Sequence, residues 1–226
     1  MSTRRVLVIA AHADDEALGC GGTLALHASR GDEVRALFMT DGVGSRGAGE
    51  DAAARQRREA ANAALACVGV RDATFLALPD NQMDGLPLLE IVRQVEPVIS
   101  AYRPDIVYTH HFADLNVDHR LVHQATMTAL RPQPGALAPT ILCFEVPSST
   151  EWQTPSAQTA FIPNWFQDIS DTFERKIAAL EFYAEEMRAW PHSRSIEAVT
   201  HLARWRGASI GVEAAEAFML ARHIAR

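Results

Sequence analysis

Residues 6–16 have the sequence Val-Leu-Val-Ile-Ala-Ala-His-Ala-Asp-Asp-Glu, an apolar run that ends in one imidazole and three carboxylates. The apolar run is typical of a β-strand covered on both faces, which needs no alternation of polar and apolar residues. The charged residues fall on the turn after this strand, and in an open α/β sheet such turns border the ligand-binding crevice. Carboxylates this close repel one another unless a cation or a shared proton relieves them, which indicates a divalent metal beside a catalytic base.

Strand-like and helix-like segments alternate along the rest of the chain. This alternation predicts an α/β fold, a Rossmann-like, mostly parallel sheet with helices on both faces. No linker divides the 226 residues, so we expect one domain over residues 1–226. Four glycines between Thr40 and Glu50 predict a loop that could act as a lid. Further strands are predicted at 34–39, 73–78, 105–109 and 140–146, and helices at 23–30, 52–68, 86–102, 118–130 and, from an apolar stripe, 173–187.

Composition narrows the classes of partner and compartment. The formal net charge of −7 argues against nucleic acid, because nucleic-acid-binding domains carry a basic surface. Cys20, Cys67 and Cys143 are far apart, which argues against a disulfide framework and favours a reducing compartment. The apolar run after Arg4 and Arg5 is short and interrupted by acids, so we predict neither a signal peptide nor a membrane span. We expect a cytoplasmic protein that acts on a small molecule, and a homo-oligomer is compatible with the sequence.

A second polar cluster, residues 110–120, follows the strand predicted at 105–109. The carboxyl ends of parallel strands share one edge of a sheet, so the two clusters can converge. His12 and Asp15 with His119 would then supply two imidazoles and one carboxylate, which with water make a catalytic zinc shell. Zinc is the expected cofactor, although the same donors suit iron, manganese or cobalt. Taken alone, each cluster has a plainer interpretation, and Asp118 could be the N-cap of the helix that follows.

Dinucleotide binding is an alternative for the first turn. Gly19 and Gly21 begin a Gly-x-Gly-x-x-Gly pattern, but Leu24 stands at the third glycine position. Asp41 lies where a ribose contact would be expected. Three carboxylates would then face a pyrophosphate, and like-charge repulsion disfavours that arrangement.

Both clusters resemble the signatures of one known family. Ala-His-Ala-Asp-Asp-Glu at 11–16 and Gly-Cys-Gly-Gly-Thr-Leu at 19–24 resemble the first motif of the PIG-L/LmbE deacetylases, with Ala13 in place of a proline. Val-Asp-His at 117–119 resembles the second motif, and Glu-Ala-Phe at 216–218 the closing segment. The resemblance implies an LmbE-like fold and a zinc-dependent amidase that removes an acetyl group from an N-acetylated amino sugar, such as an N-acetylglucosamine-containing compound.

The resemblance also assigns roles by position. It implies metal ligation by His12, Asp15 and His119, and it makes Asp14 the general base. Asp118 is expected to orient an imidazole, that of His119 or of a neighbouring histidine.

Position 116 departs from the family pattern. Many relatives carry a histidine where this chain has Asn116, whose amide can donate to an oxyanion but cannot deliver a proton near neutral pH. The general acid is therefore left among Asp114, His111 and a recycled Asp14.

Substrate contacts are predicted for short polar or charged residues near the strand ends. Asp80, with Asn81, follows the third strand and suits sugar hydroxyls, although a Pro-Asp turn explains it equally well. The set of predicted substrate-binding residues is Arg55, Asp80, Asp114 and Glu145, and further residues that could line the pocket are Arg57, Trp152 and Trp165.

Two other functions remain open at this point. The same site could serve an amidase acting on a thiol conjugate or another acylated small molecule. The chain could also be a catalytically inactive nucleotide- or sugar-binding protein of the same fold. The intact set of His12, Asp14, Asp15 and His119 argues against this second alternative.

Overall fold

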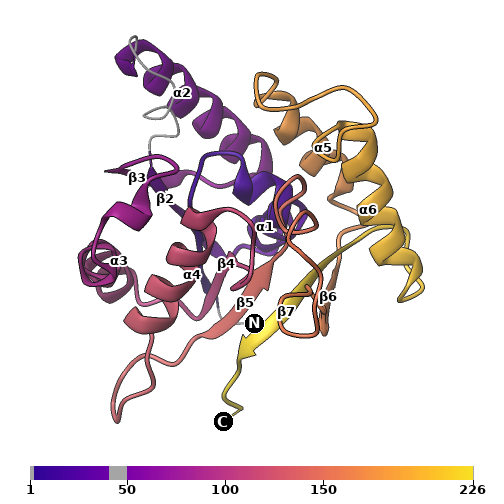
Figure 1. The fold of residues 1–226 in the computed structure, drawn as a ribbon. Coiled ribbons are helices and arrows are strands. Elements are labelled where there is room, and N and C mark those ends of the chain that lie inside the picture. The colour runs from indigo at the N-terminus through magenta and orange to yellow at the C-terminus, as the bar shows by residue number, and fades with distance from the viewer. Residues whose placement is uncertain (1–2, 41–49, 226) are drawn as a thin grey trace.

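The computed structural model describes residues 3–40 and 50–225, so the expectations for Asp41 and for the glycine-rich loop lie outside the described residues. Strands and helices alternate in this part of the chain, and the predicted α/β class is confirmed (Figure 1). The elements, including one short 3-10 turn, η1, are β1 (Arg5–Ala10), α1 (Asp15–Ser29), β2 (Glu33–Thr40), α2 (Glu50–Val68), β3 (Asp72–Leu78), η1 (Met83–Gly85), α3 (Leu88–Tyr102), β4 (Ile106–His110), α4 (Val117–Ala129), β5 (Thr140–Phe144), β6 (Trp165–Asp168), α5 (Phe173–Glu181), α6 (Ile196–Ala208) and β7 (Ala215–Arg222).

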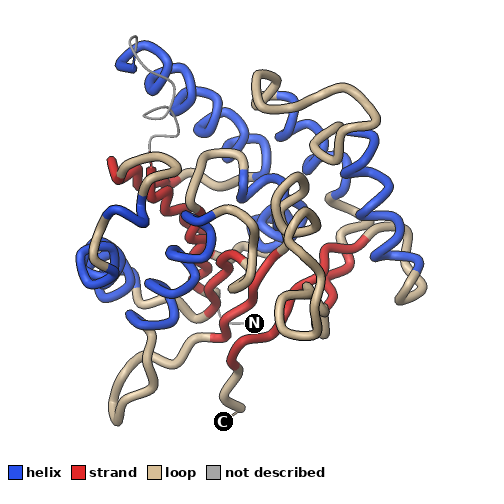
Figure 2. The backbone as a smooth tube through the Cα atoms, in the orientation of Figure 1, coloured by secondary structure: helices blue, strands red, loops and turns tan. Residues whose placement is uncertain are grey.

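The described strands form one seven-stranded sheet in the order β3-β2-β1-β4-β5-β7-β6. Helices cover both of its faces, as Figure 2 shows. Alternate residues of β1 face opposite layers: Val6 and Val8 join a core cluster with α1 and α2, whereas Leu7 and Ile9 join one with α3 and α4. All four side chains are fully buried, which explains why the β1 sequence is apolar throughout.

Strand order places the ligand-binding edge next to β1. The chain runs from β1 through β2 to β3 on one side, and then returns to β4 on the other side of β1. Strands β1 and β4 pair in parallel, with Val6 opposite Ile106, so their carboxyl ends lie side by side. This reversal of direction is the topological switch point at which open α/β sheets bind ligands.

Strands β6 and β7 and helix α6 were not predicted. Strand β7 runs antiparallel to both of its neighbours, β5 and β6, so the sheet is mostly but not wholly parallel. The helix predicted over 173–187 is shorter than expected, because α5 ends at Glu181 and the chain then turns so that Tyr183 enters the core. No helix in residues 3–40 and 50–225 is long and apolar enough to cross a membrane.

The first helix begins earlier than residue 23, where the sequence predicts its start. Helix α1 begins at Asp15, with a break at Cys20 (φ −147°, ψ 18°), so Gly19 and Gly22 lie inside it. Close packing explains both residues, because a Cβ on Gly19 would collide with the ring of Phe144, and one on Gly22 would stand 2.7 Å from Ile169 Cδ1. The pyrophosphate turn of a dinucleotide site is therefore absent from this described segment.

Candidate metal and catalytic site

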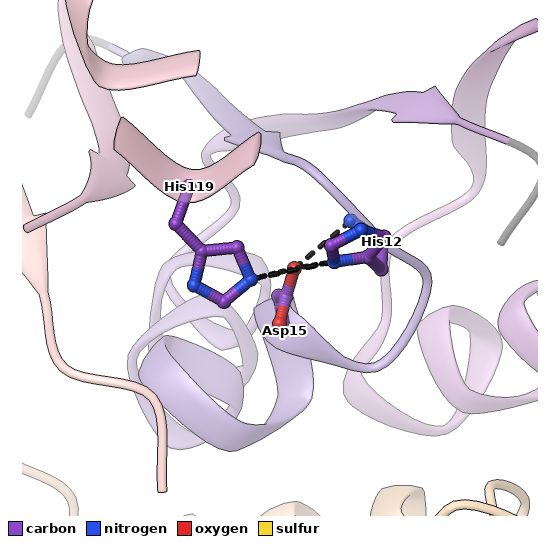
Figure 3. A group of neighbouring side chains, drawn as sticks. All are labelled: His12, Asp15 and His119. Atoms are coloured by element: carbon purple, nitrogen blue, oxygen red, sulfur yellow. Dashed lines mark hydrogen bonds and ion pairs between the residues drawn. The ribbon is translucent and has the colours of Figure 1, made fainter. Parts of the chain in front are cut away.

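Three side chains from β1, α1 and α4 and their connecting turns meet at the sheet edge (Figure 3). His12 Nδ1 and His119 Nε2 each lie 3.3 Å from Asp15 Oδ2, and the two nitrogens are 3.3 Å apart. Bonds of about 2.0–2.1 Å at tetrahedral angles place donor atoms about 3.3–3.4 Å apart, so this triangle fits a tetrahedral metal ion. Asp15 Oδ1 is buried and has no hydrogen-bond partner among the described residues, which leaves this carboxylate available as a ligand.

The nitrogens that face away from the triangle are held by carboxylates. His12 Nε2 lies 3.2 Å from both Asp80 Oδ1 and Asp118 Oδ2, and His119 Nδ1 lies 3.2 Å from Asp114 Oδ1. Each imidazole can therefore donate its proton outward and keep a lone pair for the triangle, the usual arrangement of metal-bound histidine. This argues for the triangle over a second cluster, His12 with Asp80 and Asp118, in which His12 would have to bind through Nε2.

The carboxylates around His12 and His119 favour positive charge in the site. Burial disfavours a charged imidazole, yet Asp15 and Asp114 raise the pKa of His119 to about 9. The pKa of His12 is raised in the same way, against its burial, by Asp118, Asp15 and Asp80. Protons on the two imidazoles or a metal ion can supply this positive charge.

His110 packs against the triangle of His12, Asp15 and His119. Its ring stacks on that of His119, with centroids 3.9 Å apart, and its Nε2 accepts the N–H of Ala11 at 2.8 Å. Burial and the neighbouring His119 keep the pKa of His110 well below its ordinary value, so it packs as a neutral ring.

Asp14 stands next to the triangle in an unusual backbone conformation. Its φ is +130°, a region that residues with a side chain rarely adopt, and strain of this kind clusters at functional sites. The Glu16 carboxylate holds the turn by accepting the Asp14 N–H at 3.0 Å and the Tyr183 hydroxyl at 2.7 Å. Burial raises the pKa of Glu16 to about 8.

Arg194 is a site residue that the sequence analysis missed. Its Nη1 donates to Asp14 Oδ2 at 2.9 Å and its Nε to Ser148 Oγ at 2.9 Å. Burial raises the pKa of Asp14 to about 6, and the Arg194 charge opposes that rise. Arg194 lies in an irregular segment before α6 and belongs to no recognisable motif, so only tertiary structure reveals it.

His12, Asp14, His119 and Arg194 line one pocket of about 380 Å³. Its size falls within the range of small-molecule sites. Its walls are contributed by the turns after β1, β3, β4 and β5, by α2 and α4, and by the segment between α5 and α6. The described residues that line it are His12, Asp14, Arg57, Asp80, Asn81, Leu115, Asn116, His119, Ser148, Ser149, Trp152, Glu186 and Arg194.

Residues 7–130, more than half of the chain, match the PIG-L family, described as GlcNAc-PI de-N-acetylase. The chain belongs to the PIG-L family. It is also 32% identical over 182 residues to the uncharacterized deacetylase YaiS of Escherichia coli K12, a match that covers 78% of this chain and 88% of that relative. The family resemblance seen in the two motifs is thereby confirmed.

Two further relatives carry different activities in their names. One is the 1D-myo-inositol 2-acetamido-2-deoxy-alpha-D-glucopyranoside deacetylase of Rhodococcus erythropolis, 30% identical over 83% of this chain and 69% of the relative. The other is the 4-oxalmesaconate hydratase of Pseudomonas putida, 28% identical over 84% of this chain and 76% of the relative.

Two solved structures share the fold of this chain. The hydratase GalB of P. putida aligns over 99% of this chain and 98% of its own, with a TM-score of 0.80 and 23% identity. N,N'-diacetylchitobiose deacetylase of Pyrococcus horikoshii aligns over 97% of this chain and 84% of its own, with a TM-score of 0.77 and 22% identity. At these identities the likeness concerns the fold alone.

In this PIG-L chain, Asn116 is the N-cap of α4, a role that had been weighed for Asp118. Its Oδ1 accepts the N–H groups of Asp118 and His119, at 2.8 and 3.4 Å, and its Nδ2 donates to Asn81 Oδ1 at 2.9 Å. Asp118 instead accepts the N–H groups of Asn81 and Met83, and its imidazole partner is His12 rather than His119.

Asp114, one of the predicted substrate contacts, does not line the pocket. It is fully buried and accepts hydrogen bonds from Ser149, Thr150 and the N–H of Asn116, besides its contact with His119. Burial alone would raise its pKa, but these hydrogen bonds and the His119 charge hold it well below the ordinary range. The lowered pKa favours the ionised form of Asp114, which argues against Asp114 as the general acid.

The other predicted contacts divide into those inside and those outside the pocket. Asp80 lines it, whereas exposed Arg55 does not, and Glu145 forms a bidentate pair with Arg206 outside it. His111 is fully buried, with Nε2 3.0 Å from the Thr159 carbonyl oxygen, and is absent from the pocket lining. Of the further residues, Arg57, Asn81 and Trp152 line the pocket, while Trp165 lies at another cavity.

Proposed function

We propose that this chain is a metal-dependent hydrolase, most simply a zinc enzyme, that removes the acetyl group from an N-acetylated amino sugar such as an N-acetylglucosamine-containing compound. The observation that carries the proposal is the triangle of His12, Asp15 and His119, with Asp14 beside it in the same pocket. Relatives named as deacetylases of acetamido sugars support the substrate class.

His12, Asp15 and His119 would hold the metal ion. When bound, such an ion lowers the pKa of water from about 16 to about 7 and so supplies a nucleophile at neutral pH. Asp118 and Asp80 orient His12, and Asp114 orients His119, so that both imidazoles present a lone pair.

Asp14 is the proposed general base. It takes the proton of the attacking water and then passes it to the departing amine, which replaces a separate general acid. A pKa of about 6 suits both steps near neutral pH. The Arg194 hydrogen bond fixes the orientation of this carboxylate in the pocket.

Asn116 is the proposed donor to the oxyanion. Its Nδ2 binds Asn81 with one hydrogen and has a second hydrogen to offer at the pocket. A single well-placed donor of this kind is worth about 3 kcal/mol in the transition state.

The pocket favours an uncharged substrate. Its described arginines, Arg57 and Arg194, already pair with Glu186 and Asp14. Sugar hydroxyls and an acetamide need hydrogen bonds rather than free positive charge, and Asp80 and Asn81 can supply them. An amidase for a thiol conjugate would use the same catalytic groups.

Cytoplasmic location and homo-oligomerisation stay predictions.

Hydration is the second candidate, because the P. putida relative named as a hydratase matches 84% of this chain. The paired arginines disfavour a substrate with several carboxylates. Loss of the absorbance of a conjugated unsaturated dicarboxylate, without amine release from any acetamido sugar, would replace the deacetylase proposal.

The test combines metal analysis with amine release from N-acetyl sugars. We expect about one metal ion per chain, metal-dependent amine release, and a fall of about a hundred- to ten-thousandfold in kcat for Asp14→Asn with metal content retained. Asp84→Asn, at an exposed position of η1, is the matched control. Parental turnover by Asp14→Asn would remove Asp14 as the base, and failure to take up metal would overturn the hydrolase proposal. Metal binding without turnover on any probe would favour a sugar-binding protein.

A further inference from the structure

Two apolar side chains stand in the wall of an otherwise polar pocket. Leu115 is 46% exposed and Trp152 is 53% exposed, and both line the cavity that holds His12 and Asp14. The other described residues that line this cavity are polar or charged. An exposed indole beside a binding pocket marks a surface that a ligand can cover.

The backbone of Trp152 is held in place, and its ring has an aromatic neighbour. The ring meets the His192 ring at 72°, with centroids 5.5 Å apart, and the backbone N–H of Trp152 donates to the Ser149 carbonyl oxygen. The hydroxyls of Ser149 and Thr150 donate to Asp114, the carboxylate that orients His119. The backbone from which the indole extends is thus tied to the triangle of His12, Asp15 and His119, and an aromatic side chain on a fixed backbone loses little entropy when a ligand binds.

Leu115 is anchored through its backbone, next to the residue that carries the same carboxylate. It follows Asp114 in the chain, and Arg120 Nη1 donates to the carbonyl oxygens of both residues, at 2.7 Å for Asp114 and 2.6 Å for Leu115. Both apolar side chains therefore extend from loops fixed at Asp114, at a set position relative to the reacting groups.

We propose that Trp152 and Leu115 bind an apolar group of the substrate, so that the preferred substrate is an N-acylated sugar carrying an apolar or aromatic substituent. This inference rests on the proposed function and deepens it. The polar wall holds the sugar and its amide, while the indole and the leucine remove the apolar group from water. That group is either an aglycone or an acyl chain longer than acetyl, which the test distinguishes.

The test is calorimetric binding in the Asp14→Asn background, so that probes are not consumed. The probes are N-acetylglucosamine, its phenyl β-glycoside and N-hexanoylglucosamine. We expect at least one apolar probe to bind about three- to tenfold more tightly than N-acetylglucosamine. Adding Trp152→Ala should abolish that advantage, and Trp152→Phe should restore most of it. Trp205→Ala, on α6 and 69% exposed but outside the pocket lining, is the matched control and should change nothing.

An advantage of the phenyl probe alone identifies an aglycone, and one of the hexanoyl probe alone identifies an acyl chain. Equal binding of all three probes, or an advantage that survives Trp152→Ala, overturns the inference. Amine release by the parent protein, which retains Asp14, is measured separately. Absence of amine release would overturn the proposed function, while the binding result would still decide the inference about the apolar group.

Discussion

The Lys176 ammonium lies 2.5 Å from the Glu216 carboxylate in a part of the core where both side chains are 3% exposed. Both members of this ion pair make hydrogen bonds to backbone groups of α1 on either side of its break. Lys176 Nζ donates to the Leu18 carbonyl oxygen at 2.7 Å, and the Glu216 carboxylate accepts the N–H groups of Gly22 and Thr23. The pair thereby satisfies the groups that the break at Cys20 leaves open, in the helix whose first turn carries Asp15.

We expect Lys176→Met to lower the free energy of unfolding by about 3–5 kcal/mol, because it leaves Glu216 buried and unpaired. The double variant Lys176→Met/Glu216→Gln should lose less than the sum of its single variants. Urea denaturation measures both effects. Arg206→Met, which breaks the more exposed pair with Glu145, is the comparison and should cost clearly less. A loss below 1 kcal/mol for Lys176→Met would contradict the role of the pair.

Gly19→Ala should destabilise the chain by about 1–3 kcal/mol, since the new methyl group collides with the Phe144 ring. Gly21→Ala is the matched control two residues away. Its Cβ would meet Lys176 Cγ at 3.5 Å, an ordinary contact, so stability should change by less than about 1 kcal/mol. Thermal melts of the two variants check the prediction, and equal losses would refute it.

Asp118→Asn and Asp114→Asn should each weaken metal binding by about ten- to a hundredfold, because each carboxylate orients one of the two imidazoles. Competition with a chromophoric chelator measures the affinity. Asp84→Asn should leave it unchanged. Parental affinity in both site variants would show that the imidazoles are oriented without these carboxylates.

The contribution of His27 to stability should fall as the pH drops from 7 toward 5, and His27 lies in the last turn of α1, at the opposite end from Asp15. Burial lowers the pKa of His27, outweighing its 2.7 Å hydrogen bond to Asp32. The unfolded chain therefore binds a proton below about pH 6.5 that the folded chain resists, and this favours unfolding. The unfolding midpoint of His27→Gln should therefore rise relative to that of the parent as the pH drops across this range, whereas exposed His223→Gln should follow the parent. Parallel curves for the parent and His27→Gln would exclude the effect.

The sequence predicts the metal triangle because its chemistry is local to two turns. His12 and Asp15 are three residues apart, and His119 follows a strand that the apolar pattern reveals. The parallel rule for strand ends then brings the two turns together without any side-chain detail.

What the sequence does not predict depends on long-range packing. Arg194 reaches Asp14 across 180 positions, and Asp114 is drawn inside by two hydroxyls from the loop after β5. Strand β7 escapes the apolar pattern because it carries Glu216, a buried charge that makes sense only beside Lys176.

The order of the strands in the sheet bears on when the site forms during translation. Strands β1 to β5 can pair as they emerge, whereas β6 joins the described sheet only through β7, the last of these elements to be synthesised. Until β7 arrives, the amide groups of Gly22 and Thr23 lack the Glu216 carboxylate. We therefore expect a nascent chain to form both turns of the proposed metal site before the helix that carries Asp15 is fully stabilised, and to reach its full metal affinity late in synthesis.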